Sequence, residues 1–557
     1  MLWTRLPASI LFASLCLSAA ACSGATPAPT SSSPSDGPVK PKVDRLVFAV
    51  SPPPQESNDV NLAPTSNWAT RPMWEHLIAM DAATGKFVPQ LATEWRLEPD
   101  GKSYRFLLRK GVQFHNGKGE MTAKDVLLAQ KATVRLGEVT TTNAKYFDDV
   151  LERVEAVNDY EVVFHNRVAD ADYINQIAEL VGVGWEITSA KDYEEMGSFP
   201  TQTGKPLAAT GAYQFKERQI GSFVRFQRVP YQHWRITPDF PEFEWRYMGE
   251  ASSRMAALLT GEAHLTALPR DLREGAERQG MKTIRGKVPA QRTFMSMQGL
   301  YLKDPLKPEE GLLYPDNPLN DLRVRKALNK AVNRDELNKA YYGGTAETMF
   351  LNHFHPTRQA WNPEWERRFK DEYGYDPEGA RKLLAEAGYS ASRPVKTNML
   401  MTRLPDVAEA EDLQEAIAGY WRSVGVDVTL VTMDATAARN RRTARQFDNH
   451  HTIVGTSSHQ LYGIFVYHVS FFSTGSTGTY HKEMDAMWPS LTRELDTKKQ
   501  DEIYRKVGDF LFANHLGTPL FWLPAEAVYN PKFVADWVFP GAISGSWTHL
   551  ENVKAAR

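Results

Sequence analysis

The sequence predicts a large α/β protein of two or three domains. Its 557 residues are 42% hydrophobic and 24% charged, which is ordinary for globular proteins and enough for more than one core. In the C-terminal half, residues 395–402 and 426–431 are expected to form strands, with a helix over residues 408–424 between them. One face of this helix carries apolar side chains at helical spacing: Leu413, Ile417, Trp421 and Val424. Gly425 breaks the helix, and the resulting β-α-β unit is expected to be parallel and right-handed.

Short strands are also expected near the start of the globular body. Residues 46–50 are apolar and are followed by the proline run 52–54, which ends a strand. Further along, Asp100-Gly101 provides a turn between two strands, and the second strand alternates apolar and polar positions over residues 104–108. Two such α/β lobes with chain crossings between them would form a crevice of the kind in which ligands bind.

The stretch FHNGKGEMTAKDV, residues 114–126, collects residue types that enzymes use, but their positions favour a structural role. Asn116 and Gly117 form a tight-turn pair because both tolerate positive φ. Thr122 with Asp125 three residues later resembles a capping box at the start of a helix. His115 is left without such a role. We expect its replacement to affect folding more than ligand affinity.

The first 21 residues predict a secretory signal peptide. Arg5 precedes an apolar run over residues 8–21, which is too short to span a membrane and ends in three alanines directly before Cys22. A cysteine in this place resembles a bacterial lipobox, so Cys22 is the expected lipid attachment site. Ordinary cleavage near Ala21 is the alternative. Residues 22–44 then provide the lipid-bearing cysteine and a flexible tether rich in serine and proline.

Composition excludes several classes of function. The chain has only two cysteines, Cys16 in the expected signal peptide and Cys22, so no thiol chemistry or cysteine metal site is expected in the mature protein. The net charge is −2, and removing residues 1–21 with the single Arg5 makes it −3. There is no block of Lys and Arg, so no nucleic-acid partner is expected.

Residues 77–126 resemble the N-terminal signature of the family 5 extracellular solute-binding proteins, the oligopeptide, dipeptide and nickel receptors of bacterial ABC importers. Asn116 stands where this family more often has aspartate. The matching positions are Pro89, Leu91, Ala92, Trp95, Asp100, Gly101, Phe106, Leu108, Arg109, Gly111, Phe114, His115, Gly117 and 122–126.

The resemblance continues in family order along the chain. Ala212 replaces a usual proline in the segment 209–234, and His233 separates Tyr231 from Trp234. In the segment 375–389, Asp376 is an expected helix N-cap, Leu383 and Leu384 are expected to point inward, and Gly388 is expected to end the helix. The similar segments are 209–234, 254–265, 319–337 and 375–389.

This resemblance implies a fold like that of periplasmic binding proteins. Two mixed α/β lobes would lie around a hinge and cleft, in a type II arrangement, with an extra inserted lobe. The expected organisation is lobe I from residues 45–78, 198–291 and 524–557, inserted lobe II from residues 79–197, and lobe III from residues 292–523.

The function implied by the resemblance is capture of a small solute for import. The protein would be exported to the periplasm or the outer face of the cell membrane, anchored there by lipid, and would act as a monomer. Its expected partners are a peptide or small-molecule ligand and ABC permease subunits with their ATPases, without a cofactor. A ligand sensor or quality-control factor without its own transporter is the runner-up. A hydrolase is not expected, since the sequence shows no nucleophile elbow, zinc-protease helix, P-loop or dinucleotide fingerprint.

The ligand is left open between a peptide, a nickel complex and an oligosaccharide. Peptide receptors of this family hold the ligand's α-amino group with an aspartate, but the matching segment has no acidic residue between Asp448 and Glu483. We therefore expect weaker binding of free-amine di- and tripeptides than of neutral or N-blocked ligands. Candidate ligand-binding residues are Trp68, Phe294, His459, Tyr462 and Tyr467. No metal site is expected; the weaker candidates for one are His353, His355, His450 and His451.

Overall fold

A computed structural model provides the fold of the globular body, which forms one compact unit from Lys40 to Arg557. The signal segment, Cys22 and the tether up to residue 39 lie outside the residues that the structure describes. The described residues are 40–53, 55–62, 68–135, 142–179, 184–201, 204–289, 291–401, 407, 409–433, 435–457, 481–541 and 547–557.

Lobe I, as we call the first of three bodies, is built on a seven-stranded sheet with two helices packed against it. Its strands are β1 (Arg45–Val50), β8 (Tyr213–Gln219), β9 (Phe223–Arg228), β10 (Glu242–Tyr247), β11 (Leu265–Thr266), β12 (Lys282–Arg285) and β19 (Glu526–Tyr529), and its helices are α5 (Ala251–Thr260) and α6 (Arg270–Arg278). The strand order is β12-β19-β11-β1-β10-β9-β8. β1 runs parallel to both β10 and β11, so the carboxyl ends of these three strands meet at one edge.

Lobe II is a smaller body around a four-stranded antiparallel sheet in the order β4-β5-β7-β6. Its strands are β4 (Ala92–Leu97), β5 (Tyr104–Leu108), β6 (Leu151–Asn158) and β7 (Glu161–Asn166), and its helices are α1 (Ala123–Thr133), α2 (Thr142–Val150), α3 (Tyr173–Ile177) and α4 (Ala190–Met196). The predicted turn at Asp100-Gly101 is confirmed, because β4 and β5 pair on either side of it. Phe106, Phe164 and Trp185 lie in its own buried core.

Lobe III contains a six-stranded sheet in the order β14-β18-β13-β17-β15-β16. Its strands are β13 (Gln291–Gln298), β14 (Glu347–Thr348), β15 (Val395–Met401), β16 (Val426–Thr432), β17 (His450–Ser457) and β18 (Thr518–Leu523). Its helices are α7 (Leu322–Lys330), α8 (Arg334–Tyr342), α9 (Pro363–Tyr373), α10 (Pro377–Glu386), α11 (Ala410–Ser423), α12 (Ala435–Thr443), α14 (Lys482–Arg493) and α15 (Thr497–Asn514).

The β-α-β unit predicted in this lobe is confirmed. β15 and β16 pair in parallel, and α11 packs on them with Leu413, Ile417 and Trp421 fully buried. The helix predicted after Asp376 is also confirmed: Asp376 accepts a hydrogen bond from the Gly379 N–H, and Leu384 is buried while Leu383 is partly buried. The segment 319–337 holds two helices, since α7 ends at Lys330 and α8 begins at Arg334.

Shorter elements complete the described chain. They are the strand pair β2 (Ile78–Met80) and β3 (Phe87–Pro89), the pair β20 (Val534–Asp536) and β21 (Lys554–Ala555), and the 3-10 helices η1 (Val60–Leu62), η3 (Arg71–Met73), η4 (His115–Gly117), η5 (Pro308–Glu310), η6 (Pro318–Asn320) and η7 (Leu550–Asn552).

The stretch 114–126 has the structural role that its pattern predicts. Asn116 and Gly117 both have positive φ, at 57° and 69°. α1 begins after Thr122, whose backbone N–H donates to Asp125 Oδ2 at 2.7 Å. His115 is 1% exposed, and its Nε2 donates to the carbonyl of Gly211 at 2.8 Å. This histidine, left without a role by the sequence, therefore ties lobe II to lobe I.

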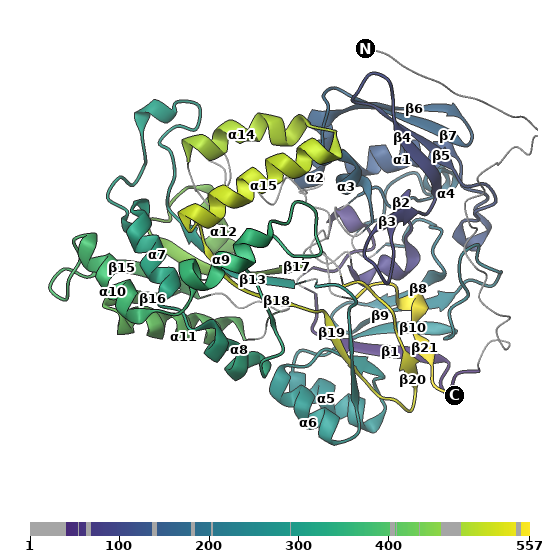
Figure 1. Ribbon diagram of the computed structural model, residues 1–557. Helices are drawn as coiled ribbons and strands as arrows, with labels where there is room; N and C mark the ends of the chain where they lie inside the picture. The colour runs from purple at the N-terminus through teal and green to yellow at the C-terminus, as the bar shows by residue number, and fades with distance from the viewer. Residues whose placement is uncertain are drawn as a thin grey trace, which may run out of the picture. The chain divides into compact units, whose positions relative to one another are not determined.

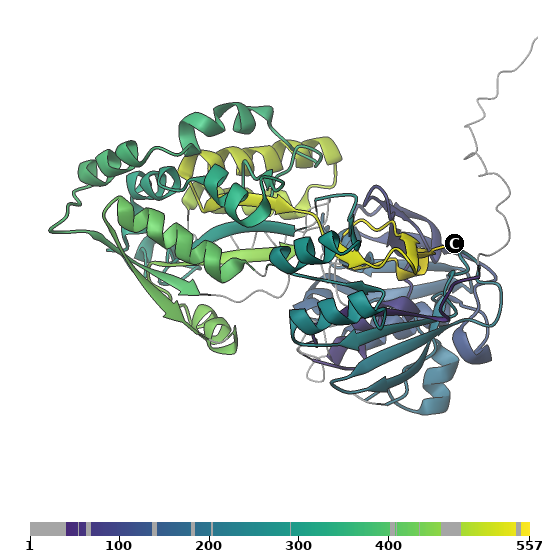
Figure 2. The ribbon, with the colours of Figure 1, turned by 90° about the horizontal axis from the view of Figure 1, so that it is seen from below.

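Two stretches of chain cross between lobes I and III, side by side. One connects β12 to β13 and the other connects β18 to β19, and the Gly286 N–H donates to the carbonyl of Ala525 at 2.7 Å between them. The six-stranded sheet and its helices lie on one side of these crossings and the seven-stranded sheet lies on the other (Figures 1 and 2). A paired crossing of this kind can work as a hinge.

Candidate functional site

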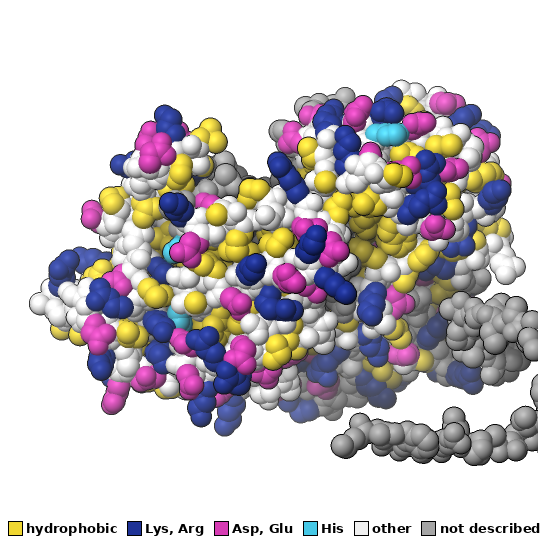
Figure 3. Space-filling view, turned by 45° about the horizontal axis from the view of Figure 1, so that its top comes forward, with side chains coloured by type: hydrophobic (Ala, Val, Ile, Leu, Met, Phe, Trp, Pro, Cys, Tyr) yellow, Lys and Arg dark blue, Asp and Glu magenta, His cyan; other side chains and the backbone are white. Residues whose placement is uncertain are grey.

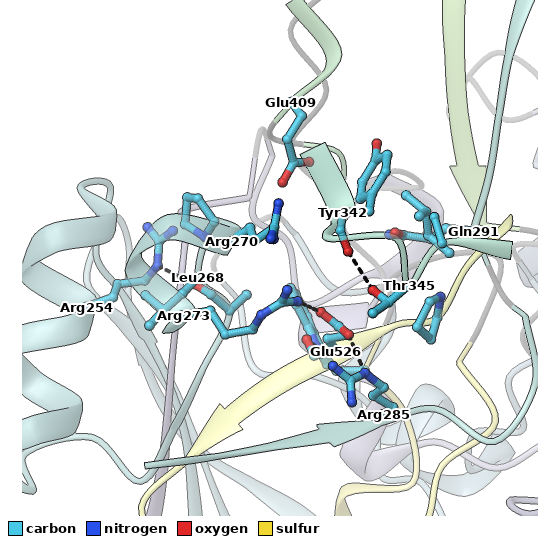
Figure 4. A pocket seen from close by; sticks show the side chains of 16 residues that line it. Arg254, Leu268, Arg270, Arg273, Arg285, Gln291, Tyr342, Thr345, Glu409 and Glu526 are labelled. Atoms are coloured by element: carbon cyan, nitrogen blue, oxygen red, sulfur yellow. Dashed lines mark hydrogen bonds and ion pairs between the residues drawn. The ribbon is translucent and has the colours of Figure 1, made fainter. Parts of the chain in front are cut away.

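A cavity of about 400 Å³ lies beside the crossings and is lined by residues of both lobes (Figure 4). Lobe I contributes residues of α5, α6, β12 and β19, and lobe III contributes residues at the end of α8, the start of β13 and the end of β18. Part of the wall is apolar, with Leu268, Pro269, Leu523, Pro524 and Trp547. A cavity of this size fits a small ligand.

Arg254 lies at the lobe I side of this cavity, at the carboxyl ends of the parallel strands. From α5 it donates to Ser51 Oγ (3.2 Å) after β1, to the carbonyls of Met248 (2.8 Å) and Gly249 (2.7 Å) after β10, and to that of Ala267 (3.2 Å) after β11. Arg254 is 7% exposed, and burial lowers its pKa from the usual range. The guanidinium thus holds three strand ends together at the place where ligands usually bind in parallel sheets.

Two further arginines share one carboxylate at the same wall. Arg285 Nε donates to Glu526 Oε1 at 2.6 Å, and Arg273 pairs with the other oxygen of Glu526. These contacts are visible in Figure 4. They tie α6, the end of β12 and the start of β19 together, so the lobe I end of the crossing is held by charge-assisted hydrogen bonds.

Arg270 and Glu409 face the cavity from opposite lobes. Arg270, the first residue of α6, donates from Nη1 to the carbonyl of Ala340 in α8 at 3.0 Å, and its Nη2 pairs with Glu274 at 2.9 Å. Burial raises the pKa of Glu409, the residue before α11, while the fields of Arg273 and Arg270 act in the opposite direction. The contact between Arg270 and Ala340 joins lobe I to lobe III in this conformation.

Tyr342, at the end of α8, has a hydroxyl group that needs a hydrogen-bond partner. The residue lines the cavity and is 9% exposed. Within the described part of the chain, its buried hydroxyl has no hydrogen-bond partner. Buried hydroxyls are usually paired, so this atom could be satisfied by a polar ligand.

Two of the predicted ligand-binding residues, Trp68 and Phe294, are described by the structure, and neither lines this cavity. Trp68 packs edge-on against Trp245 in the core of lobe I, with ring centroids 5.0 Å apart. Phe294 is 1% exposed and packs with Met349 and Trp522. His459, Tyr462 and Tyr467 lie outside the described residues.

The four candidate metal-binding histidines have separate surroundings. His355 Nε2 contacts Glu347 at 2.7 Å, His450 Nδ1 donates to the carbonyl of Asp448, and His353 contacts Arg292. His451 is fully buried against Trp421, and burial lowers its pKa to about 3. Among the described residues, no group of three or more His, Cys, Asp or Glu is placed to hold a metal.

Sequence reasoning missed the arginines at the cavity. Arg270 and Arg273 have a recognisable spacing, three residues apart at the start of a helix that follows a strand. Arg254, Arg285 and Glu409 come from other parts of the chain, so only the fold brings their charges together. On the face drawn in Figure 3, basic and acidic side chains are mixed without a field of one sign.

The comparisons with known proteins agree with this architecture. The profile of the bacterial extracellular solute-binding proteins, family 5, middle region, matches residues 86–469, which is more than half of the chain. The chain belongs to this family. The dipeptide-binding protein of Escherichia coli is 27% identical over 383 residues, which cover 65% of this chain and 66% of that protein.

Two solved structures of the same fold carry different ligands. The periplasmic binding protein DppA of Helicobacter pylori, in complex with the peptide STSA, has a TM-score of 0.69 and 21% identity over 92% of this chain and 98% of its own. NikZ of Campylobacter jejuni, in complex with Ni(L-His), has a TM-score of 0.73 and 17% identity, and the match covers 92% of this chain and 99% of NikZ. At these identities, the likeness shows the fold.

The expected fold class, two α/β lobes with an inserted lobe as in periplasmic binding proteins, is confirmed by these two structures. The members of the family that match are solute-binding proteins of ABC importers and not enzymes, as expected for this chain. They are periplasmic or extracellular proteins. Within the described residues, no helix has the length and apolar character needed to cross a membrane.

Proposed function

We propose that this protein captures a small polar or peptide-like solute between lobes I and III and delivers it to the permease of an ABC importer. The observation that carries this proposal is the cavity beside the paired crossings, whose wall is shared by both lobes. Family membership supports the delivery step.

The mechanism is closure of the lobes without breaking a bond. Rotation at the crossings would separate the two walls of the cavity, and a ligand that contacts both walls would favour the closed state. The hydrogen bonds from Arg270 to the Ala340 carbonyl and from the Ala171 N–H to the Thr492 carbonyl (3.0 Å) join lobe III to lobes I and II in the closed state. The permease would then recognise the closed form.

We also propose that lipid on Cys22 anchors the protein outside the cell membrane. Support comes from the apolar run over residues 8–21 and the small residues before Cys22. Cys22→Ser is expected to abolish incorporation of a labelled fatty acid and to release the protein from the membrane fraction. A variant that keeps its label and stays with the membrane would contradict the anchor.

The ligand is proposed to lack a free ammonium group. No acidic residue lies between Asp448 and Glu483, so a buried α-amino group would have no countercharge from this segment. In calorimetry, N-acetylated dipeptides are expected to bind at least about tenfold more tightly than the same free-amine dipeptides. Tight binding of ordinary dipeptides would rule this out.

Native mass spectrometry of the purified mature protein tests the binding function itself. A co-purified molecule of small mass, lost when the protein is unfolded and recovered on adding back the extract, is expected. The matched control is the same protein stripped by unfolding and refolding. A protein that never carries a ligand, from any growth medium, would argue against solute capture.

A further inference from the structure

The lining of the cavity carries more arginines than carboxylates. Its wall carries the four arginines Arg254, Arg270, Arg273 and Arg285, but only the two glutamates Glu409 and Glu526. Arg273 and Arg285 both pair with Glu526, so that carboxylate is already shared by two cations. Arg270 already pairs with Glu274, so Arg254 is the one arginine of this wall without an ion pair among the described residues, and Glu409 lies on the same wall.

Arg254 is the most telling of these residues, because its charge is buried without a carboxylate partner. Its four hydrogen bonds from Nε and Nη1 all go to neutral oxygens, and no ion pair to it is present among the described residues. Nη2 makes none of these bonds. The field of the exposed Glu250, four positions earlier, acts on Arg254, but no carboxylate bonds to the guanidinium in the described part of the chain. A buried cation without a directly bonded countercharge is costly, so an anion entering the cavity would be stabilised there.

Two other buried arginines provide a comparison for Arg254, because they do not line the cavity. Arg325 and Arg334 also donate to backbone carbonyls, with 2% and 6% exposure, but neither lines this cavity. Their role is fully explained by tying lobe III elements together. Arg254 shares that structural role and, in addition, lines a ligand-sized space.

The start of α6 also lies at the wall of the cavity. The helix begins at Arg270, which lines the cavity, and no side chain caps its N-terminus. A helix N-terminus favours anions, and Asp271 in the first turn offsets part of this effect.

We propose that the solute is an anion, and that its carboxylate or phosphate group is bound in this cavity by Arg254, with Arg270 adding positive charge. This inference rests on the proposed solute capture and names the ligand class. A small organic acid or phosphate ester without a free ammonium group fits both this cavity and the lack of acidic residues between Asp448 and Glu483. Glu409 opposes such a ligand and limits its affinity.

Matched probe pairs test the charge preference by calorimetry. The carboxylate arm compares N-acetyl-dialanine with its C-terminal amide, and the phosphate arm compares N-acetylglucosamine 6-phosphate with N-acetylglucosamine. The acidic member of at least one pair is expected to bind about tenfold or more tightly than its neutral partner, with affinity falling as salt is raised. The molecule recovered from the purified protein is expected to carry an acidic group.

Three charge variants then locate the site. Arg270→Gln is expected to weaken the anionic probe about three- to tenfold, and Glu409→Gln to strengthen it by a similar factor. Arg278→Gln, an exposed arginine of the same helix, is the matched control and is expected to change affinity less than about twofold. Arg254→Gln is expected to abolish anion binding, and its melting temperature separates this effect from unfolding.

The outcomes distinguish this inference from the proposed function. A neutral or cationic molecule recovered from the protein, or tighter binding of the neutral probes, would overturn the anion site while solute capture stands. Equal losses of both members of a pair in Arg270→Gln would assign Arg270 to lobe closure and overturn its charge role. A protein that carries no ligand and binds no probe would remove both proposals.

Discussion

At the residue scale, His115 and His233 come from two separate sequence motifs and donate hydrogen bonds to the same backbone segment. His115 of lobe II donates from Nε2 to the Gly211 carbonyl and from its backbone N–H to the Ala209 carbonyl, both at 2.8 Å. His233 donates from Nε2 to the carbonyl between them, that of Thr210, at 2.8 Å. Three successive carbonyls are therefore satisfied by two motifs distant in sequence.

His115 gives a prediction about acid stability. Burial lowers its pKa to about 4, so the folded protein keeps it neutral while the unfolded chain protonates it near pH 6.5. Its stabilising effect is complete above pH 6.5 and is lost as the pH falls from 6.5 toward 4. His115→Gln retains a hydrogen-bond donor but cannot gain a proton. Between pH 7.5 and 5, the free energy of unfolding of the wild type is expected to fall by about 1–2 kcal/mol more than that of His115→Gln.

Urea unfolding at several pH values measures this difference. His115→Ala is the second variant, and it should lose about 2–3 kcal/mol at pH 7.5, because the Gly211 carbonyl loses its donor and a cavity forms. Affinity for the solute is expected to stay unchanged in both variants. Equal pH dependence in the wild type and His115→Gln would show that this imidazole does not titrate as its burial requires.

At the element scale, the helices, strands and turns that depend on residues close together in the chain were predicted correctly from the sequence. The helix after Thr122, the turn at Asn116-Gly117 and the β-α-β unit from residue 395 to 432 follow from capping, backbone preference and apolar periodicity within a few residues. The boundary between α7 and α8 is set in the same local way, since Asn333 starts the second helix by accepting from the Glu336 N–H. The segment 458–480, where several candidate site residues lie, is outside the described part of the chain.

Gly211 provides the element-scale prediction. It lies where the segment 207–213 meets η3, and a Cβ there would come within 2.6 Å of the Met73 carbonyl carbon and 2.9 Å of the Pro72 oxygen. Because these are backbone atoms of lobe I, neither can move without shifting the segment whose Gly211 carbonyl accepts from His115 of lobe II. Gly211→Ala is expected to lower the free energy of unfolding by more than about 2 kcal/mol.

Gly419→Ala is the matched control for that substitution. Gly419 is exposed on α11, and nothing lies within 4 Å of a Cβ added there. The same chemical change is therefore expected to stabilise the protein by up to about 1 kcal/mol, through helix propensity alone. Thermal or urea unfolding of both variants decides the matter. Similar effects at the two positions would show that the close packing at Gly211 is not what the geometry indicates.

At the scale of the whole molecule, the cavity could not be foreseen because its parts are distant in sequence. Arg254 and Glu526 are 272 positions apart in the numbering, and Glu409 belongs to the other lobe. Their proximity depends on the two crossings and on the pairing of β12 with β19 and of β13 with β18. The resemblance to a family predicted that a cleft exists between lobes, and the fold adds which charges line it.

The paired crossings lead to a last prediction, that the lobes move as bodies about this hinge. Gln279, directly after α6 in lobe I, and Lys339, in α8 of lobe III, are exposed positions on the two lobes. Spin labels on Gln279→Cys and Lys339→Cys, with Cys22→Ser, should give a broad distance distribution without ligand and a single short distance with it. A pair within lobe III, Lys339→Cys and Arg368→Cys, is the control and should not respond. If the distribution between α6 and α8 is the same with and without bound solute, the lobes do not close and capture must occur in a preformed cavity.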